Sequence, residues 1–462
     1  MTFECPDSKA WLHGFPHDER SNWKFSPAAS PDDEPAIPSP DMFDFLPAPD
    51  DKSAGSFRLP HRSECAAHLE LLEALFALRQ RVLRSEALDS VIGTEPVRVA
   101  KTGYNGDTKT FKDGWLGTRR QVKWPIFVEF AVVRFLAWCK PFSQAQAAKT
   151  RISLPPVDVI MVWHALMLNP RLFMEKFQGT PLHAASMPWQ HIHEVIDSRV
   201  WTLEPSEGEA TAFERATGLR SDLLGELSRW PTGPGDEPKQ SRLGAFTLEE
   251  KDGESSSGRE AVNSPVARRY AACFDGRLDR PFAVALRDAV IRQTSFVDKM
   301  HGLLWIRSPS LAGTLRRGIA RYGNFLGLVK QYPGTMIVPT LDIDLAWHTH
   351  QCQGLQYATA MREHVGRFVN HDDTIAKDKL GDGFAKSSNY YRIQYGDEYK
   401  VCGCWDCETL LDAVEGMAGA APEDVNMAEI ARSAEKRLRY YRAVEMARVG
   451  EKPLPKFPMQ QA

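Results

Sequence analysis

The stretch "WPIFVEFAVVRFLAWCKPF" at residues 124–142 is apolar on almost every side when it is drawn as a helix. A helix at a protein surface carries its apolar side chains along one stripe, so a helix that is apolar all round has to be enclosed by other helices. Apolar residues recur at spacings of three and four in further segments, whereas the best strand signal is the short run "TMIVP" at 335–339. The sequence therefore predicts a mainly α-helical fold with few short strands. The other helix-like segments are 68–85, 278–300, 311–333 and 427–449.

Two breaks in composition divide the chain. Residues 1–60 are rich in proline, serine and aspartate, a composition that buries too little apolar surface to offset the entropy of ordering, so we expect a disordered tail. Residues 231–262 are polar and glycine-rich and are too long for an ordinary loop within a domain, so we expect a flexible linker. The predicted organisation is two helical halves, at 61–230 and 263–462, joined by this linker.

The two predicted halves resemble each other. "RFLAWCK" at 134–140 followed by "LPPVDVIMVWHALMLNP" at 154–170 parallels "NFLGLVK" at 324–330 followed by "IVPTLDIDLAWHTHQCQ" at 337–353. An internal duplication is the simplest explanation, and it predicts two similar folds. The copies differ in polarity, because three apolar positions of the first copy carry polar or thiol groups in the second. In this alignment Asp158, Trp163 and His164 pair with Asp342, Trp347 and His348, while Ile160, Leu166 and Leu168 pair with Asp344, His350 and Cys352.

Composition and charge argue against some classes of partner. Hydrophobic residues make up 43% of the chain and charged residues 25%, and the formal net charge is −3. This charge creates no overall field that would attract nucleic acid or an anionic membrane. The first twenty residues have no basic region followed by an apolar run, and no apolar run reaches the length of about eighteen residues that a membrane span needs. We therefore expect a soluble cytoplasmic protein with neither a nucleic-acid nor a membrane partner.

The segment "LDIDLAWHTHQC" at 341–352 concentrates groups that bind metal ions or protons. In a helix, Asp344, His348 and Cys352 would lie on one face, and His350 would lie almost opposite. In an extended segment, His348 and His350 would instead point the same way and could share one ion. The sequence leaves both geometries open.

The first copy offers a simpler interpretation of one histidine. His164 lies in a purely apolar setting, so we interpret it as a hydrogen-bonded core residue. Around His348, in contrast, an aspartate, a second histidine and a cysteine are added within nine residues. Burying these groups in a helix is unfavourable unless they have partners. We therefore predict a metal-binding or catalytic role for His348.

A second polar segment, "GRFVNHDD", brings His371, Asp372 and Asp373. One interpretation is that they cap a helix, whose positive end favours acidic residues. The other is that they complete the site of His348, with nitrogen and oxygen ligands that suit zinc with an open position or non-haem iron. We expect a divalent metal, with zinc favoured over iron. The predicted nitrogen and oxygen ligands are Asp344, His348, His350 and His371, and the predicted catalytic groups are His348, His350, Asp372 and Asp373, either aspartate serving as ligand or general base.

The segment "CGCWDC" at 402–407 predicts thiolate ligation. Cys404 and Cys407 have the two-residue spacing that lets one tetrahedral ion bind both sulfurs, and Cys402 could add a third. Cys352 or a histidine could complete the set. Three free thiols or a redox pair are the alternatives.

The strings "PTLDIDLAWHTHQ", "GRFVNHDD" and "CGCWDCE", in this order, resemble the glycine-rich domain-containing protein-like family of plants and fungi, and "VDVIMVWHALMLNP" resembles its earlier motif. The resemblance covers most of 61–235 and 265–410. It implies little about activity, because the family is largely uncharacterised and its plant members are linked to development and stress responses. Some plant relatives carry a glycine-rich tail and an RNA-recognition segment. This chain ends in a charged helical segment instead, so RNA binding is not carried over.

These residues support two hypotheses about function. The first is a metal-dependent enzyme acting on a small-molecule metabolite, in a specialised fungal biosynthetic pathway. The second is a non-catalytic, zinc-stabilised helical interaction or scaffold protein, whose proline-rich N-terminal tail binds a protein partner. An open coordination position favours the enzyme, and closed four-ligand coordination favours the scaffold.

Overall fold

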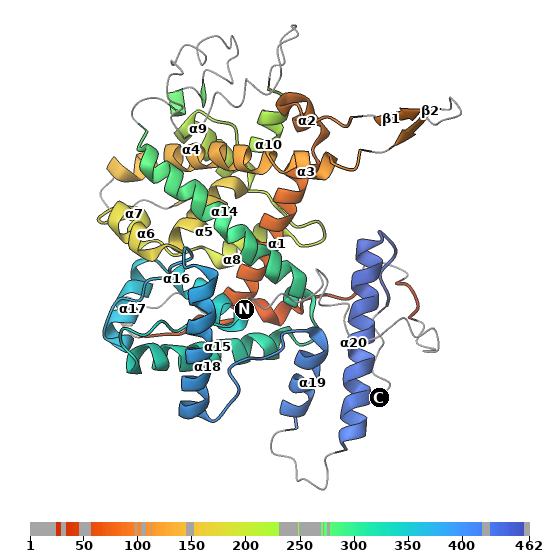
Figure 1. Ribbon diagram of the computed structural model, residues 1–462, viewed down its shortest axis with the longest axis vertical. Coiled ribbons are helices and arrows are strands. Elements are labelled where there is room, and N and C mark those ends of the chain that lie inside the picture. Colours follow the sequence, from red (N-terminus) through yellow and green to blue (C-terminus); the bar gives the residue numbers. More distant parts are fainter. Residues whose placement is uncertain are drawn as a thin grey trace. The chain divides into compact units, whose positions relative to one another are not determined.

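The computed structural model describes residues 25–28, 34–45, 57–97, 99–102, 108–111, 113–144, 152–230, 248, 269–270, 272–274, 278–417 and 426–456. The described chain is mainly helical, as predicted, and its strands are short (Figure 1). Nearly all of the predicted linker lies outside the described residues. Parts of the predicted disordered tail are described, and Ile37 and Met42 within them are buried.

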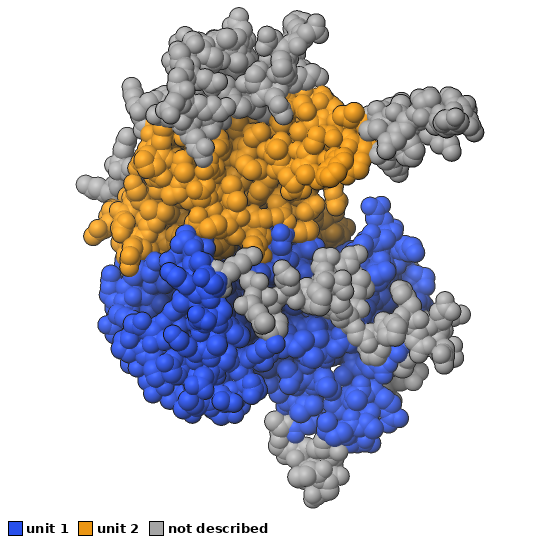
Figure 2. All heavy atoms as spheres, viewed as in Figure 1, with its two compact units in different colours: residues 1–73, 186–194, 296–462 blue, residues 74–185, 195–295 orange. Residues whose placement is uncertain are grey.

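The chain forms two compact units, each built from several segments (Figure 2). Unit 1 consists of residues 1–73, 186–194 and 296–462, and unit 2 of residues 74–185 and 195–295. Three helices contain a unit boundary, α1 (Arg62–Arg84), α8 (Trp189–Val195) and α14 (Arg280–Leu303). We keep three features as predictions: the boundaries of the two halves, the linker and the duplication.

Unit 2 is built around α4 (Lys123–Gln144) and α5 (Val157–Met167). A helix that is apolar on almost every side should be enclosed, and α4 is: Phe127, Val128 and Phe130 are fully buried or nearly so. The residues of α5 from Asp158 to Met167 are buried as well. The remaining elements of this unit are α2 (Glu86–Ile92), α3 (Leu116–Arg120), α6 (Pro170–Phe177), α7 (Pro181–Ala184), α9 (Glu207–Thr217), α10 (Leu223–Ser228) and the two-stranded antiparallel sheets β1 (Val99–Thr102) with β2 (Thr108–Phe111) and β3 (Ile196–Asp197) with β4 (Thr202–Leu203).

Unit 1 is built around α15 (Leu311–Gln331), which packs against α16 (Leu341–Gln351), α17 (Leu355–Val365), α18 (Lys377–Tyr395) and α19 (Trp405–Glu415). Phe325 and Leu326 of α15 and Ile343 and Trp347 of α16 share one apolar core. Each such side chain stabilises the fold by about 1.5–3 kcal/mol when it is buried. The other elements are the 3-10 helices η3 (Pro40–Phe43) and η4 (Trp305–Arg307), α8 (Trp189–Val195) and α20 (Met427–Val449).

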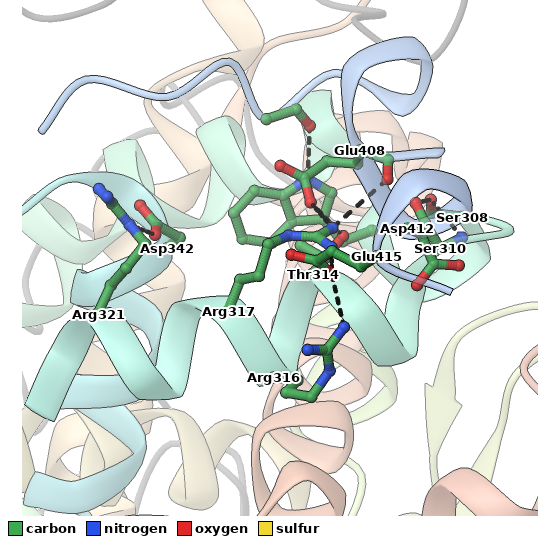
Figure 3. A network of polar contacts seen from close by, with 12 residues as sticks. Ser308, Ser310, Thr314, Arg316, Arg317, Arg321, Asp342, Glu408, Asp412 and Glu415 are labelled. Atoms are coloured by element: carbon green, nitrogen blue, oxygen red, sulfur yellow. Dashed lines mark hydrogen bonds and ion pairs between the residues drawn. The ribbon is translucent and has the colours of Figure 1, made fainter. Parts of the chain in front are cut away.

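Ion pairs fix α19 on α15 (Figure 3). Arg317 of α15 contacts Glu408 at 2.5 Å and Glu415 at 2.7 Å, and Thr314 donates a hydrogen bond to Glu408. The helices approach closely at Gly313, where an added Cβ would lie 2.2 Å from Asp412 Oδ1. The position of α19 therefore depends on complementary charge as well as on packing.

The predicted strand at 335–339 is wrong. These residues form no strand but lead into α16, and side chains satisfy the backbone groups that a neighbouring strand would otherwise pair. Val338 N donates to Ser387 Oγ at 2.8 Å, and the Tyr399 hydroxyl donates to Val338 O at 2.7 Å. Tertiary contacts thus override the local strand preference of this run.

The two aligned segments have similar local structures. In each, a long helix is followed by an 11-residue helix whose second residue is an aspartate, Asp158 in α5 and Asp342 in α16. Each aspartate pairs with an arginine of the long helix at 2.6 Å, Arg134 or Arg321. The two arginines do not align with each other in sequence, since Arg134 aligns with Asn324. The likeness nevertheless supports the predicted duplication.

A membrane-spanning helix is not found in the described residues. None of the described single helices combines the length and apolar character that a span requires, although α5 and α6 meet the test when they are taken together across a bend of 105°.

The aspartates of the two ion pairs should differ in their contribution to stability. Arg134 and Asp158 are buried completely or nearly so, whereas Arg321 and Asp342 are each partly exposed. We expect Asp158→Ala to lower the free energy of unfolding by about 3–5 kcal/mol, because it leaves a buried charge unpaired. Asp342→Ala should cost about 1.5–3 kcal/mol. Urea unfolding measures both, with Asp197→Ala, at an exposed ion pair, as a control that should cost under about 0.5 kcal/mol. Equal losses in all three variants would contradict the expected order.

Candidate metal centres

Asp344 and His348 lie on one face of α16. The segment is helical, so the helical alternative is correct and the extended one is not. The four-residue spacing brings Asp344 Oδ1 to 3.2 Å from His348 Nε2. His371, in the segment after α17, places its Nε2 at 3.2 Å from the same nitrogen of His348. The structure thus brings together three of the predicted ligands, which we call the Asp/His group.

Two of the distances between these atoms, both 3.2 Å from His348 Nε2, fit a metal ion. A tetrahedral zinc ion with bonds of about 2.0–2.1 Å separates its ligand atoms by about 3.3–3.4 Å. Asp344, His348 and His371 form a group whose ligand atoms all lie within 4.8 Å of one another, and the group contains no fourth residue from the described chain. His348 is only 2% exposed, and the side chain of Asp344 is 20% exposed although its Oδ1 is buried. An ion held there would keep a coordination position open.

The charge of the aspartate suits this use. Burial alone would raise the pKa of the Asp344 carboxyl, but the neighbouring His348, followed by His371 and Lys299, outweighs burial and holds this pKa below its ordinary value. The carboxyl group is therefore ionised at neutral pH, as a metal ligand must be.

Two aromatic residues outside the predicted set of ligands, Trp347 and Tyr357, hold the segment of His371 in place. Trp347 Nε1 donates to the Tyr357 hydroxyl at 2.9 Å, and this hydroxyl donates to Val369 O at 2.8 Å. The ring of His371 packs edge-on against Trp347, with centroids 5.1 Å apart. Gly366, in the left-handed conformation with φ 84°, ends α17 and turns the chain into this segment.

The structure does not bring His350 to the Asp/His group. Its Nδ1 lies 2.9 Å from the Tyr322 hydroxyl, within the core shared by α15 and α16. Burial, followed by the positive charges of Arg58 and His364, lowers the pKa of His350 to about 3. A neutral, buried imidazole with a hydroxyl partner has the features of a core histidine.

The predicted aspartates and one predicted cysteine also lie outside these groups. Asp372 is exposed, and its Oδ1 accepts hydrogen bonds from the backbone N and the hydroxyl of Thr374. Asp373 is half-buried and does not join the Asp/His group. Cys352, the C-cap of α16, is fully buried and away from the other thiols, and burial raises its pKa.

Cys402, Cys404 and Cys407 form a second group, the Cys group, in which the sulfur atoms lie within 4.8 Å of one another. Cys404 is the N-cap of α19, and Cys407 lies in its first turn. Two indoles anchor the segment, because Trp305 Nε1 donates to Gly403 O at 2.7 Å and Trp405 Nε1 donates to Leu303 O at 2.9 Å. The Cys group shares no residue with the Asp/His group, so the predicted ligands form two groups.

The environment of the thiols disfavours the redox alternative. Burial raises the pKa of Cys404 to about 12 and also raises the pKa of Cys407. A reactive redox cysteine needs a lowered pKa, because the thiolate is the attacking species. These thiols become good ligands when a cation replaces their protons.

Comparison with known proteins finds a family model that matches part of the chain. Residues 250–359 match the family model described as glycine-rich domain-containing protein-like. The expected resemblance to this family is confirmed. The chain is 26% identical over 294 residues to Glycine-rich domain-containing protein 1 of Arabidopsis thaliana, which covers 60% of this chain and 29% of that protein. It is 35% identical over 97 residues to Glycine-rich domain-containing protein 2 of the same plant, which covers 19% of this chain and 12% of that protein.

The matches leave most of each relative uncovered, since the chain spans less than a third of either one. No solved structure matches the chain. The segment that matches the glycine-rich domain-containing protein-like family includes Asp344 and His348, whereas His371 and the Cys group follow it.

We expect His350 to be dispensable for metal binding. His350→Leu introduces the residue that the first copy has at this position, Leu166, and should leave the ion affinity of the Asp/His group within about threefold. It should lower the free energy of unfolding by about 1–3 kcal/mol, because the Tyr322 hydroxyl loses its partner. Zinc titration and urea unfolding measure the two effects, with His348→Ala as the variant that should lose the ion. If the His350→Leu variant lost the ion, His350 would be a ligand after all, as the sequence predicted.

Proposed function

We propose that this protein is a metal-dependent enzyme in which Asp344, His348 and His371 hold a divalent cation with an open coordination position. The observation that carries the proposal is the convergence of one carboxylate oxygen and two imidazole nitrogens, with His348 Nε2 lying 3.2 Å from each of its neighbours. A proton shared by the two imidazoles would pair their nitrogens and leave the carboxylate oxygen out. A cation would bind all three atoms together.

The ligand types favour zinc, with non-haem iron as the alternative. A bound ion of this kind polarises carbonyl or phosphoryl oxygens and lowers the pKa of bound water. Asp344 supplies the negative charge, and the buried His348 fixes the position of the ion. Asp372 and Asp373, next to His371 in the chain, stay the proposed general-base candidates. We also keep as predictions a small-molecule metabolite as substrate, a biosynthetic pathway and a cytoplasmic location.

The number of ions per chain tests the proposal. We expect protein purified without chelators to contain two ions per chain by elemental analysis, one in each group. His348→Ala should lose one ion, and the double variant Cys404→Ala, Cys407→Ala should lose the other. The double variant loaded with Co²⁺ should change its visible absorption when azide is added, because azide would enter the open position.

Two results would count against this function. An unchanged ion content in His348→Ala would show that the Asp/His group holds no metal. An azide-insensitive Co²⁺ spectrum would show a closed coordination sphere, which the enzyme hypothesis does not allow.

A second candidate function is a zinc-stabilised scaffold, and α19 provides the observation that favours it. Leu410, Leu411 and Val414 follow Cys407 in α19 at helical spacing and are all exposed, as is Met417 just beyond the end of the helix. Contiguous exposed apolar side chains are typical of a surface that binds a partner. In this case the ion in the Cys group would stabilise the start of α19, and the exposed face of the helix would bind the partner.

The scaffold candidate predicts a stability effect of the Cys group. An ion at about 100 times its Kd adds about 2.7 kcal/mol to the free energy of unfolding. We expect Cys407→Ala to lose this contribution in zinc-containing buffer and to match the wild type once a chelator is present. Cys273→Ala, at a half-buried cysteine outside the group, is the control. Thermal unfolding followed by circular dichroism measures the difference, and equal midpoints of the Cys407→Ala variant and wild type in zinc would contradict a stabilising ion.

A further inference from the structure

Gln351, the last residue of α16, is a buried amide without hydrogen bonds. Its side chain is 1% exposed, and neither Oε1 nor Nε2 has a hydrogen-bond partner. Buried polar groups in folded proteins almost always have partners, so an amide with both ends unpaired needs a physical reason.

A complementary unpaired atom lies on the same helix. His348 Nδ1 is also buried and has no hydrogen-bond partner. Since His348 Nε2 faces Asp344 and His371, an ion in the Asp/His group would bind Nε2 and leave the proton of the neutral ring on Nδ1. Histidine ligands of metal ions almost always donate this second N–H to an acceptor. His348 therefore lacks one acceptor, and Gln351 Oε1 is an acceptor that lacks a donor.

The helix geometry places the two side chains within reach. Residues three apart on a helix are neighbours, with Cβ atoms about 5–6 Å apart. Side chains on a helix lean toward its N-terminus, which is the direction from Gln351 to His348. The two groups are not hydrogen-bonded as they stand, so the proposed bond involves a rotation of the Gln351 side chain.

The apolar copy provides an independent observation. In the alignment of α5 with α16, His164 pairs with His348, whereas Ile160 and Met167 stand at the positions of Asp344 and Gln351. The copy that lacks the carboxylate ligand thus also lacks the amide. The amide and the carboxylate ligand therefore occur together in the second copy and are both missing from the first.

We propose that Gln351 is a positioning residue of the metal centre: its Oε1 accepts the Nδ1–H of His348 and keeps Nε2 free for the ion. The inference rests on the Asp/His group as a metal site. In this role the amide orients His348 and selects its tautomer, and it contacts neither the ion nor the substrate.

The test separates metal affinity from stability. Gln351→Met, in the full chain with Cys404→Ala and Cys407→Ala, removes the acceptor but keeps the volume, and it introduces the residue found in the first copy. We expect zinc affinity, measured by competition with a chromophoric chelator, to fall about 10–100-fold. The metal-free protein should unfold at the same or a higher urea concentration, because an unpaired buried amide has been removed.

Two further variants sharpen the test. Gln351→Glu retains an acceptor and should keep its zinc affinity within about threefold of that of the parent. Gln353→Met removes another buried glutamine, beyond the end of α16, and should leave zinc affinity unchanged.

The outcomes distinguish the inference from the function on which it rests. If the parent protein binds zinc and Gln351→Met binds it equally well, Gln351 is not a positioning residue, although the centre stands. If Gln351→Met loses affinity and metal-free stability together, the role is structural and the inference is overturned. If the parent with an intact Asp/His group binds no zinc, iron or cobalt, the centre and the inference fail together.

Discussion

Two arginines of α15, one turn apart, hold the helices that carry both candidate metal groups. Arg321 pairs with Asp342 in the first turn of α16, and Arg317 pairs with Glu408 in the first turn of α19 (Figure 3). In both cases the acidic partner also lies near the positive end of its own helix, where negative charge is stabilised. Because α16 supplies two ligands of the Asp/His group and α19 supplies two of the Cys group, the geometry of both groups depends on α15.

The polar residues of α16 would destabilise an ordinary core helix. Some have internal partners: His350 faces the Tyr322 hydroxyl, and Thr349 donates to Leu345 O and lies 2.9 Å from His68 Nδ1. Other buried side-chain atoms of α16 have no hydrogen-bond partner, and these are Asp344 Oδ1, His348 Nδ1, His350 Nε2 and both polar atoms of Gln351. Each unpaired buried group costs about 1–3 kcal/mol, which is a substantial fraction of a total stability of about 5–15 kcal/mol. A cation in the Asp/His group would satisfy Asp344 Oδ1 directly, and the proposed hydrogen bond between His348 and Gln351 would pair two further atoms.

Much of the fold follows from local pattern. The apolar run at 124–142 becomes α4 at Lys123–Gln144, and the helix predicted at 427–449 is found at the same residues as α20. The helical spacing of Asp344 and His348, and the opposite position of His350, also follow once α16 is known to be a helix. Such features depend on neighbours within a turn or two, which the sequence contains directly.

Features that depend on contacts between distant segments were predicted only in part, although His371 was among the predicted ligands. His371 reaches His348 only because the Trp347–Tyr357–Val369 contacts hold its segment, and residues 335–339 stay out of a sheet because Ser387 and Tyr399 satisfy Val338. Gln351 was missed for another reason, since an amide has no place in a ligand signature. A comparison with Met167 would have drawn attention to it as one of the positions where the second copy is polar and the first is apolar.

The two groups also differ in ways that suit different tasks. The Asp/His group is built from borderline nitrogen and oxygen ligands around a nearly buried imidazole, whereas the Cys group offers soft sulfur ligands at the exposed start of a helix. An ion in the Asp/His group would be held by an imidazole that the core keeps rigid, which favours chemistry at an open position. An ion in the Cys group would tie the anchored segment around Gly403 to the first turn of α19, and the exposed apolar residues follow directly along that helix. On physical grounds the catalytic and scaffold hypotheses therefore describe two different places in unit 1, and one chain can satisfy both.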